Sequence, residues 1–180
     1  LLRDTGEKEE DLMSEYIITC CSTADMPASY FEENHVPYTC FHFMLDGKEY
    51  PDDLGKTVPF DKFYQMITDG AQPTTAQINA EQYAELFESV LKEGKDVLHL
   101  TLSSGISGTI NSANIAKVQM EEKYPERKVV VIDSIAASSG YGLLVDKALE
   151  NQKNGMSLEE NAEWIEKNKN KLHHWFFSTD

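Results

Sequence analysis

Residues 101–109 have the sequence Thr-Leu-Ser-Ser-Gly-Ile-Ser-Gly-Thr, and they join the apolar run Val97 to Leu102 to a helical pattern from Ile110 to Glu122. A strand, a hydroxyl-rich turn and a helix, in this order, direct free backbone N–H groups and the positive end of the helix at one point. A strand this apolar is typical of a parallel sheet buried on both faces, where ligands sit beyond the carboxyl ends of the strands. We therefore expect an anion site at this turn.

The same order of strand, turn and helix recurs along the chain. Lys128 to Asp133 contains four consecutive β-branched residues, and it precedes the small-residue turn Ser134 to Gly142 and a helix from Leu143 to Gln152. Tyr16 to Cys21 is a further apolar and β-branched strand near the start. Strands that alternate with helices predict an α/β fold with a mostly parallel sheet and helices on both faces.

A hairpin is expected between these units. Val36 to Leu45 alternates aromatic and aliphatic residues, Asp46-Gly47 is a turn signal, and Lys48 to Tyr50 can return as a short edge strand.

A helix and a polar turn follow the hairpin. Apolar residues recur at helical spacing from Phe60 to Gly70, and Gln72 to Gln77 has the composition of a turn with two hydroxyls. Asn79 with Gln82 three residues later predicts a partial capping box for the next helix, and Ser157 is expected to cap a later one.

The charge excludes two classes of partner. Only 16 lysines and arginines stand against 31 acidic residues, a formal net charge of −15, so we expect no binding to nucleic acid or to an anionic membrane surface. No apolar run approaches the roughly 20 residues that span a bilayer, so a membrane-spanning helix is not expected. Residues 1–15 are acidic and lack an apolar signal core, which predicts a disordered extension and no secretory leader.

The three cysteines indicate a reducing compartment. Cys20, Cys21 and Cys40 are odd in number and form no Cys-x-x-Cys pair, so neither a disulfide framework nor a zinc site is indicated. We expect Cys20 and Cys21 to be ordinary strand residues and the protein to be cytoplasmic.

A serine hydrolase is one reading of the turn, with Ser107 as nucleophile, Asp133 at a strand end and His99 nearby in sequence. The spacing departs from the Gly-x-Ser-x-Gly elbow, because the second glycine follows Ser107 directly, and His99 lies inside a strand. A core or edge histidine accounts better for His99, and an esterase or lipase using Ser107 is kept as the alternative function.

Cofactor motifs are missing from the sequence. It contains neither Gly-Lys-Ser/Thr nor Gly-x-Gly-x-x-Gly, and the neighbouring His173 and His174 would diverge on a strand. No cofactor and no metal are expected.

Two hydroxyl loops remain, Thr74-Thr75 and Ser103 to Thr109, and together they can hold a carboxylate. A hydrogen bond to a charged group contributes about 1.5 to 3 kcal/mol and a helix N-terminus about 0.3 to 1 kcal/mol, so a head group alone would bind weakly. The other reading is that these hydroxyls only cap helices.

Four motifs in order resemble those of the DegV family of fatty-acid-binding proteins. They are Ser22-Thr23-Ala24-Asp25-Met26-Pro27, Pro73-Thr74-Thr75-Ala76-Gln77, Ser104-Gly105-Ile106-Ser107-Gly108-Thr109 with Asn111-Ser112-Ala113, and Val131-Ile132-Asp133-Ser134 with Gly140 to Leu144. The chain departs from the family pattern at Cys21, where an Asp is usual, and at Ala76, where a Ser is usual. The resemblance implies that residues 16–180 are the N-terminal α/β lobe of a DegV-type protein and that a second lobe is largely absent.

The resemblance also implies a function. Thr75 and Ser107 would hydrogen-bond the carboxylate of a long-chain fatty acid, with Ser104 as a weaker candidate, and the hydrocarbon tail would enter a tunnel completed by the second lobe. Such bacterial proteins are similar to the binding subunit of a fatty acid kinase, which presents the acid to a separate ATP-binding partner. We expect no catalysis by this chain alone.

Overall fold

The structure of the chain is a computed structural model that describes residues 15–175, and its centre is a four-stranded parallel sheet. The strands are β1 (Tyr16–Cys21), β2 (Tyr38–Thr39), β6 (Asp96–Thr101) and β7 (Val129–Asp133), in the order β2-β1-β6-β7. All three pairings are parallel, and every residue of β6 is buried. The predicted α/β fold with a mostly parallel sheet is confirmed.

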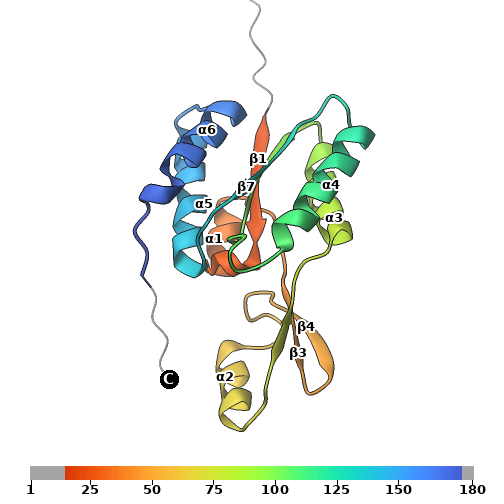
Figure 1. Cartoon of the computed structure of the whole chain (residues 1–180), viewed down its shortest axis with the longest axis vertical. Coiled ribbons are helices and arrows are strands. Elements are labelled where there is room, and N and C mark those ends of the chain that lie inside the picture. The colour runs from red at the N-terminus through yellow and green to blue at the C-terminus, as the bar shows by residue number, and fades with distance from the viewer. Residues whose placement is uncertain (1–14, 176–180) are drawn as a thin grey trace, which may run out of the picture.

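Helices cover both faces of this sheet, as predicted. Figure 1 shows α3 (Ala80–Leu91) and α4 (Thr109–Lys123) on one side, and α1 (Ala28–Glu33), α5 (Ser138–Lys153) and α6 (Leu158–Asn168) on the other. Buried apolar residues of β1, β6 and β7 pack between these two layers, which is why the strands lack the alternation of a half-exposed sheet.

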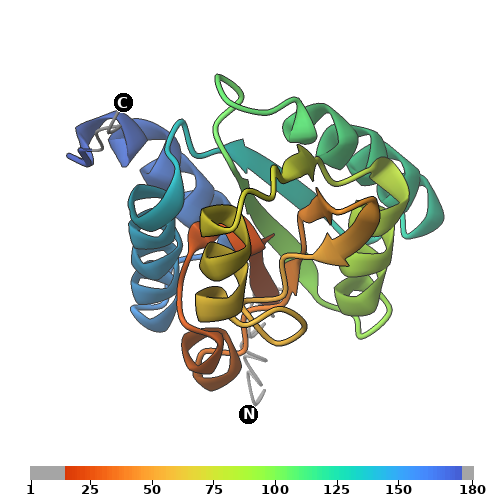
Figure 2. The ribbon, with the colours of Figure 1, turned by 90° about the horizontal axis from the view of Figure 1, so that it is seen from below.

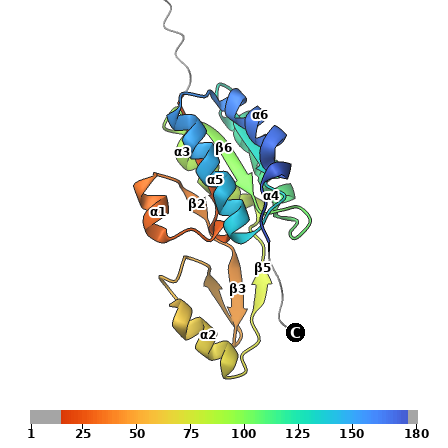
Figure 3. The ribbon, with the colours of Figure 1, turned by 90° about the vertical axis from the view of Figure 1, so that its left-hand side faces the viewer.

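A second, smaller sheet lies beyond one end of the parallel sheet. It is antiparallel, with β3 (His42–Leu45) between β4 (Lys48–Pro51) and β5 (Thr74–Ala76), and α2 (Phe60–Thr68) lies beside it. Figures 2 and 3 show this small sheet and α2 across the end of the parallel sheet.

The predicted hairpin is confirmed in β3 and β4. Asp46 and Gly47 connect the strands with φ angles of 51° and 75°, and left-handed conformation at both central residues matches the twist of a tight hairpin. The alternating run Val36 to Leu45 was predicted as one strand, but it is divided between β2 and β3, which belong to different sheets.

The polar turn predicted for Gln72 to Gln77 is wrong in part, because β5 lies within it. Thr75 pairs with Phe43 of β3. A three-residue polar strand has too short a pattern to be recognised, and only its long-range pairing makes it a strand.

Helix α5 begins at Ser138, five residues before the predicted start at Leu143. A run of serine and glycine has low helix propensity, but here tertiary packing overrides it. A Cβ on Gly142 would lie 2.5 Å from the backbone oxygen of Ala24, so only glycine allows the helix to approach that turn. The predicted capping box at Asn79 is present, and Ser157 caps α6 as predicted, there too with a capping box.

The ends of the chain lie largely outside the described residues. This holds for residues 1–14 of the predicted acidic extension and for residues 176–180 of the predicted lobe. The final apolar run is described only up to Trp175, and residues 172–175 form neither helix nor strand.

Three polar residues of the core lie within the strands, as predicted. Cys20 and Cys21 are free, completely buried thiols of β1. His99 of β6 is also completely buried, and its Nδ1 lies 2.8 Å from the hydroxyl oxygen of Thr19. Burial lowers the pKa of His99 from its ordinary 6.5 to about 3.

This pKa predicts a pH-dependent stability. The unfolded chain binds a proton at His99 below pH 6.5 and the folded chain does not until about pH 3, so stability present above pH 6.5 is lost as the pH falls. We expect His99 to reduce the free energy of unfolding by about 2 kcal/mol between pH 7 and pH 5. Urea denaturation at several pH values should show this slope in the wild type and in His173→Gln, at an exposed histidine, but a shallower one in His99→Gln. Equal slopes in all three would contradict the assignment.

Candidate functional site

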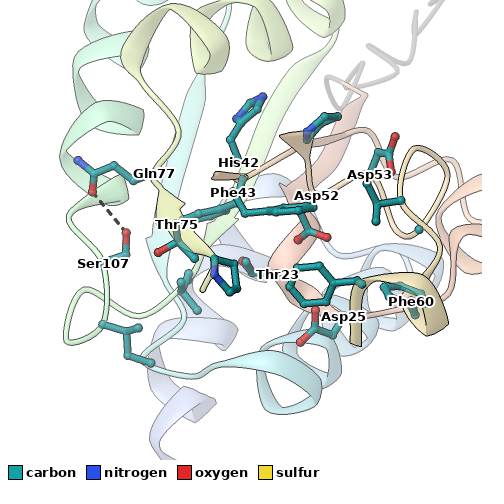
Figure 4. Close-up of a pocket in the computed structure, with 18 of the residues that line it drawn as sticks. Thr23, Asp25, His42, Phe43, Asp52, Asp53, Phe60, Thr75, Gln77 and Ser107 are labelled. Carbon is teal, nitrogen blue, oxygen red and sulfur yellow. Dashed lines mark hydrogen bonds between the residues drawn. The ribbon is translucent and has the colours of Figure 1, made fainter. Parts of the chain in front are cut away.

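A pocket of about 740 Å³ lies between the carboxyl edge of the parallel sheet and the small sheet, and Figure 4 shows it in close-up. Its walls come from the turn after β1, the small sheet, α2 and the turn that joins β6 to α4. The volume lies within the range of small-molecule sites.

The turn before α4 is held by its own hydrogen bonds and by β7. The N–H groups of Ile106 and Ser107 both donate to the Ser103 carbonyl, at 3.0 and 3.1 Å, and the Ser103 N–H donates to the Ala136 carbonyl at 3.1 Å. The N–H of Ser104 donates to Oδ1 of Asp133 at 3.1 Å. These bonds fix the direction in which the Ser107 side chain points.

Ser107 lies in the pocket, two residues before the first residue of α4. Its Oγ accepts a hydrogen bond from the Thr109 N–H at 3.2 Å and donates one to Oε1 of Gln77 at 3.4 Å (Figure 4). The N-cap residue itself, Gly108, has no side chain to cap the helix. Ser107 therefore satisfies one helix N–H, as the capping interpretation proposed, and also lines the pocket.

Thr75 reaches the same pocket from the small sheet. It is exposed, it lines the pocket, and its hydroxyl has no hydrogen-bond partner among residues 15–175. Thr75 and Ser107 are far apart in sequence, with Thr75 in the small sheet and Ser107 in the turn after β6, yet one pocket contains both side chains (Figure 4).

Ser104 is placed differently. It is exposed, it is not among the residues that line the pocket, and it bonds to Asp133. Burial acts to raise the pKa of Asp133, but hydrogen bonds from Ser104 and from the Ile135 N–H lower it below its ordinary value. Ser104 thus contributes to the attachment of the turn to β7.

An aromatic wall forms the apolar side of the pocket. The ring of Phe63 on α2 lies edge-on to that of Phe43 on β3, with centroids 5.1 Å apart, and Phe60 and Tyr64 line the pocket beside it. Phe60 and Tyr64 are 57% and 64% exposed, and α2 has no buried residue. The helical spacing of these aromatic residues predicted α2, but sequence reasoning did not connect them with the site.

The end of the pocket that lies away from Ser107 is acidic. Figure 4 shows Asp25, Asp52 and Asp53 on the side away from Ser107. Burial raises the pKa of Asp52, and the charges of Asp25 and Asp53 raise it further, although a hydrogen bond with Ser22 opposes this. Among the described residues that line the pocket there is no lysine or arginine. An anionic group is therefore favoured at the hydroxyl end, away from the carboxylates.

A buried polar contact joins β1, α3 and the first residue of α4. The hydroxyl of Tyr83 lies 2.8 Å from Oγ1 of Thr109 and 3.2 Å from Sγ of Cys21. Burial raises the pKa of the Cys21 thiol to about 11, so it is uncharged near neutral pH. Sequence reasoning missed this contact, because nothing in the spacing of Cys21, Tyr83 and Thr109 indicates that they meet.

The geometry gives Ser107 no general base. Activation of a serine requires a base within about 2.6 to 3.2 Å, whereas the described partners of the Ser107 hydroxyl are an amide oxygen and a backbone N–H. His99, the histidine that the hydrolase reading named, is buried beside Thr19.

Comparison with known proteins gives one family. The model of the DegV family, described as an uncharacterised protein family, matches residues 17–180. A DegV domain-containing protein of Clostridium perfringens is 37% identical over 164 residues, which cover 91% of this chain and 56% of that protein. The chain therefore spans about half the length of the curated relatives it matches.

Solved structures resemble the chain over a similar range. A stearic-acid-binding protein from Eubacterium ventriosum has a TM-score of 0.77 and 30% identity over 84% of this chain and 52% of that one. A DegV family protein from Thermus thermophilus, reported for its fatty acid binding, has a TM-score of 0.75 and 30% identity over 87% and 54%.

Membrane-spanning helices and metal-binding groups are both absent from the described residues. Between residues 15 and 175, no helix has the length and apolar character needed to cross a membrane. Over the same range, no group of three or more histidine, cysteine or acidic side chains is arranged to hold a metal ion.

The contact through Tyr83 can be tested by removing one oxygen. Tyr83→Phe leaves the buried Thr109 hydroxyl and the Cys21 thiol without this partner, so we expect the free energy of unfolding to fall by about 1 to 2 kcal/mol in denaturant titrations. Tyr124→Phe is the matched control, since that hydroxyl donates to Glu88 near the surface, and we expect a smaller loss. A Tyr83→Phe protein as stable as the wild type would show that the contact contributes nothing.

Proposed function

Because the chain belongs to the DegV family, we propose that it binds a long-chain fatty acid, with the carboxylate at Thr75 and Ser107 and the hydrocarbon along the aromatic wall. The observation that carries the proposal is that two hydroxyls, one from the small sheet and one from the turn after β6, line one pocket that also has an apolar wall. A carboxylate only accepts hydrogen bonds, and hydroxyls donate them. Ser104, outside the pocket lining, stays the weaker candidate.

The energetics assign different roles to the two parts of the ligand. Each hydrogen bond from a hydroxyl to the carboxylate contributes about 1.5 to 3 kcal/mol. Burial of the tail contributes about 0.8 kcal/mol per CH₂ group, so a long chain supplies on the order of 10 kcal/mol before the costs of binding. The tail therefore sets the affinity, and the hydroxyls set the orientation.

The proposal includes presentation of the acid to an ATP-binding kinase partner. Thr75, Gln77 and Gly108 are exposed, so a carboxylate at this end of the pocket can be reached from outside. The aromatic wall lies on the other side of the head group's position, which would leave the tail covered while the carboxylate faces the partner. The partner itself is proposed from the family resemblance.

The proposed compartment is the cytoplasm. Cys20, Cys21 and Cys40 are all free, and free thiols persist in a reducing compartment.

The head-group assignment predicts a selective loss of binding. In the full-length protein, Thr75→Ala with Ser107→Ala should weaken binding of palmitate by at least about tenfold, because two charge-assisted hydrogen bonds are removed. Binding of the matching fatty alcohol should change much less, and both can be measured by displacement of a fluorescent fatty acid. Thr74→Ala is the control, because Thr74 neighbours Thr75 but does not line the pocket. Unchanged palmitate affinity in the double variant would refute the assignment.

An esterase using Ser107 is the other candidate, and a chemical probe separates the two. A serine without a general base should not react, so we expect no labelling of the purified protein by an alkyl fluorophosphonate at concentrations that label a serine esterase. We also expect no ATP turnover by this protein alone. Labelling that Ser107→Ala abolishes would support the esterase instead.

A further inference from the structure

We propose that Gln77 is a third head-group residue. When the ligand binds, the Ser107 hydroxyl donates its hydrogen bond to the ligand instead of to the Gln77 amide, and the amide donates a hydrogen bond of its own to the head group. This inference rests on the proposed function, and it adds Gln77 to the proposed head-group residues Thr75 and Ser107.

Gln77 lies beside Ser107 and is close in sequence to Thr75 (Figure 4). It follows β5 directly, two residues after Thr75, and it lines the pocket with an exposed side chain. Its Oε1 accepts the hydrogen bond from Ser107 at 3.4 Å, and a Cβ built on Gly108 would lie 3.3 Å from the same oxygen. The amide therefore lies against the first turn of α4, where Figure 4 shows it beside Ser107.

A count of protons shows why the amide matters. The Ser107 hydroxyl has one proton, which it gives to Gln77, while its oxygen already accepts from the Thr109 N–H. A carboxylate can only accept hydrogen bonds. To bind one, the Ser107 hydroxyl must therefore break its hydrogen bond to Gln77 and donate to the carboxylate instead. The bond of 3.4 Å is longer than an ordinary hydrogen bond, and a charge-assisted bond to a carboxylate is stronger, so the exchange is favourable.

The exchange leaves the Gln77 amide free to turn. A half-turn about its last bond puts Nε2 where Oε1 was, and Nε2 carries two N–H donors. One can donate to the second lone pair of the Ser107 oxygen, and the other can donate to the carboxylate. The three side chains then present only donors to the ligand, with no charged group of their own.

The amide is also suited to the electrostatics of the pocket. Asp25, Asp52 and Asp53 already place carboxylates at the other end, and no lysine or arginine lines the pocket. A carboxylate at position 77 would accept the hydrogen bond from Ser107 but could not donate one to the ligand, and its charge would repel the head group. A glutamine provides the same size with donors and without charge.

The test is Gln77→Glu in the full-length protein, which keeps the shape of the side chain. We expect palmitate to bind at least about tenfold more weakly and the matching fatty alcohol to bind within about twofold of the wild type, because the alcohol carries its own donor and no charge. Gln77→Ala, which removes the donors without adding charge, should weaken palmitate binding by a smaller factor, about threefold to tenfold.

Gln82→Glu is the matched control. It adds the same charge five residues away, outside the pocket lining, and glutamate preserves the capping box because it also accepts the Asn79 N–H. We expect palmitate affinity within about twofold of the wild type for this variant. Equal palmitate affinities for Gln77→Glu and Gln82→Glu would overturn the role of Gln77.

Failure of the Gln77 role can be distinguished from failure of the proposed head-group site. If Thr75→Ala with Ser107→Ala weakens palmitate binding and Gln77→Glu does not, only the inference about Gln77 fails. If the wild type does not distinguish palmitate from the alcohol and neither set of variants changes this, the head-group site itself is wrong.

Discussion

Parallel pairing on both sides of β6 is the constraint on which the candidate site depends. Leu98 of β6 pairs with Ile18 of β1 on one side and with Val130 of β7 on the other. Because all three strands run in the same direction, the turns that follow them meet at one edge of the sheet. The pocket therefore receives Asp25 from the turn after β1 and Ser107 from the turn after β6, while Asp133 at the end of β7 anchors the Ser107 turn.

A carboxylate at this edge would be bound without a lysine or arginine from the described pocket lining. Hydroxyls, an amide and the imidazole of His42 remain as side-chain donors, and a single hydrogen bond from any of them is weaker than a bidentate arginine contact. Neutral donors bring an advantage, because they need no counter-charge of their own when the ligand is absent, and a buried unpaired cation would be costly. Affinity then depends on the tail, which agrees with the extent of the aromatic wall compared with the few head-group contacts.

Local chemistry was readable from the sequence, and long-range contacts were not. The Asn79 capping box and the Ser157 cap need only residues within one turn, and the buried strands need only an apolar run, so these features were predicted. The strand β5 and the early start of α5 depend on partners elsewhere in the chain, as at Gly142, whose lack of a side chain is required by the Ala24 backbone. For the candidate site, motif resemblance gave Thr75 and Ser107, but the position of Gln77 follows only from the pairing of β5 with β3 beside the α4 turn.

Helix α2 links the proposed ligand to the stability of the small sheet. It has no buried residue, and its described packing consists of ring contacts such as Phe63 with Phe43 and of Phe60 against Gly55. Aromatic side chains that are more than half exposed, as Phe60 and Tyr64 are, contribute little until something covers them. A hydrocarbon tail along this wall would bury the same surface, so under the proposed function binding stabilises α2 in proportion to the apolar area that the tail covers.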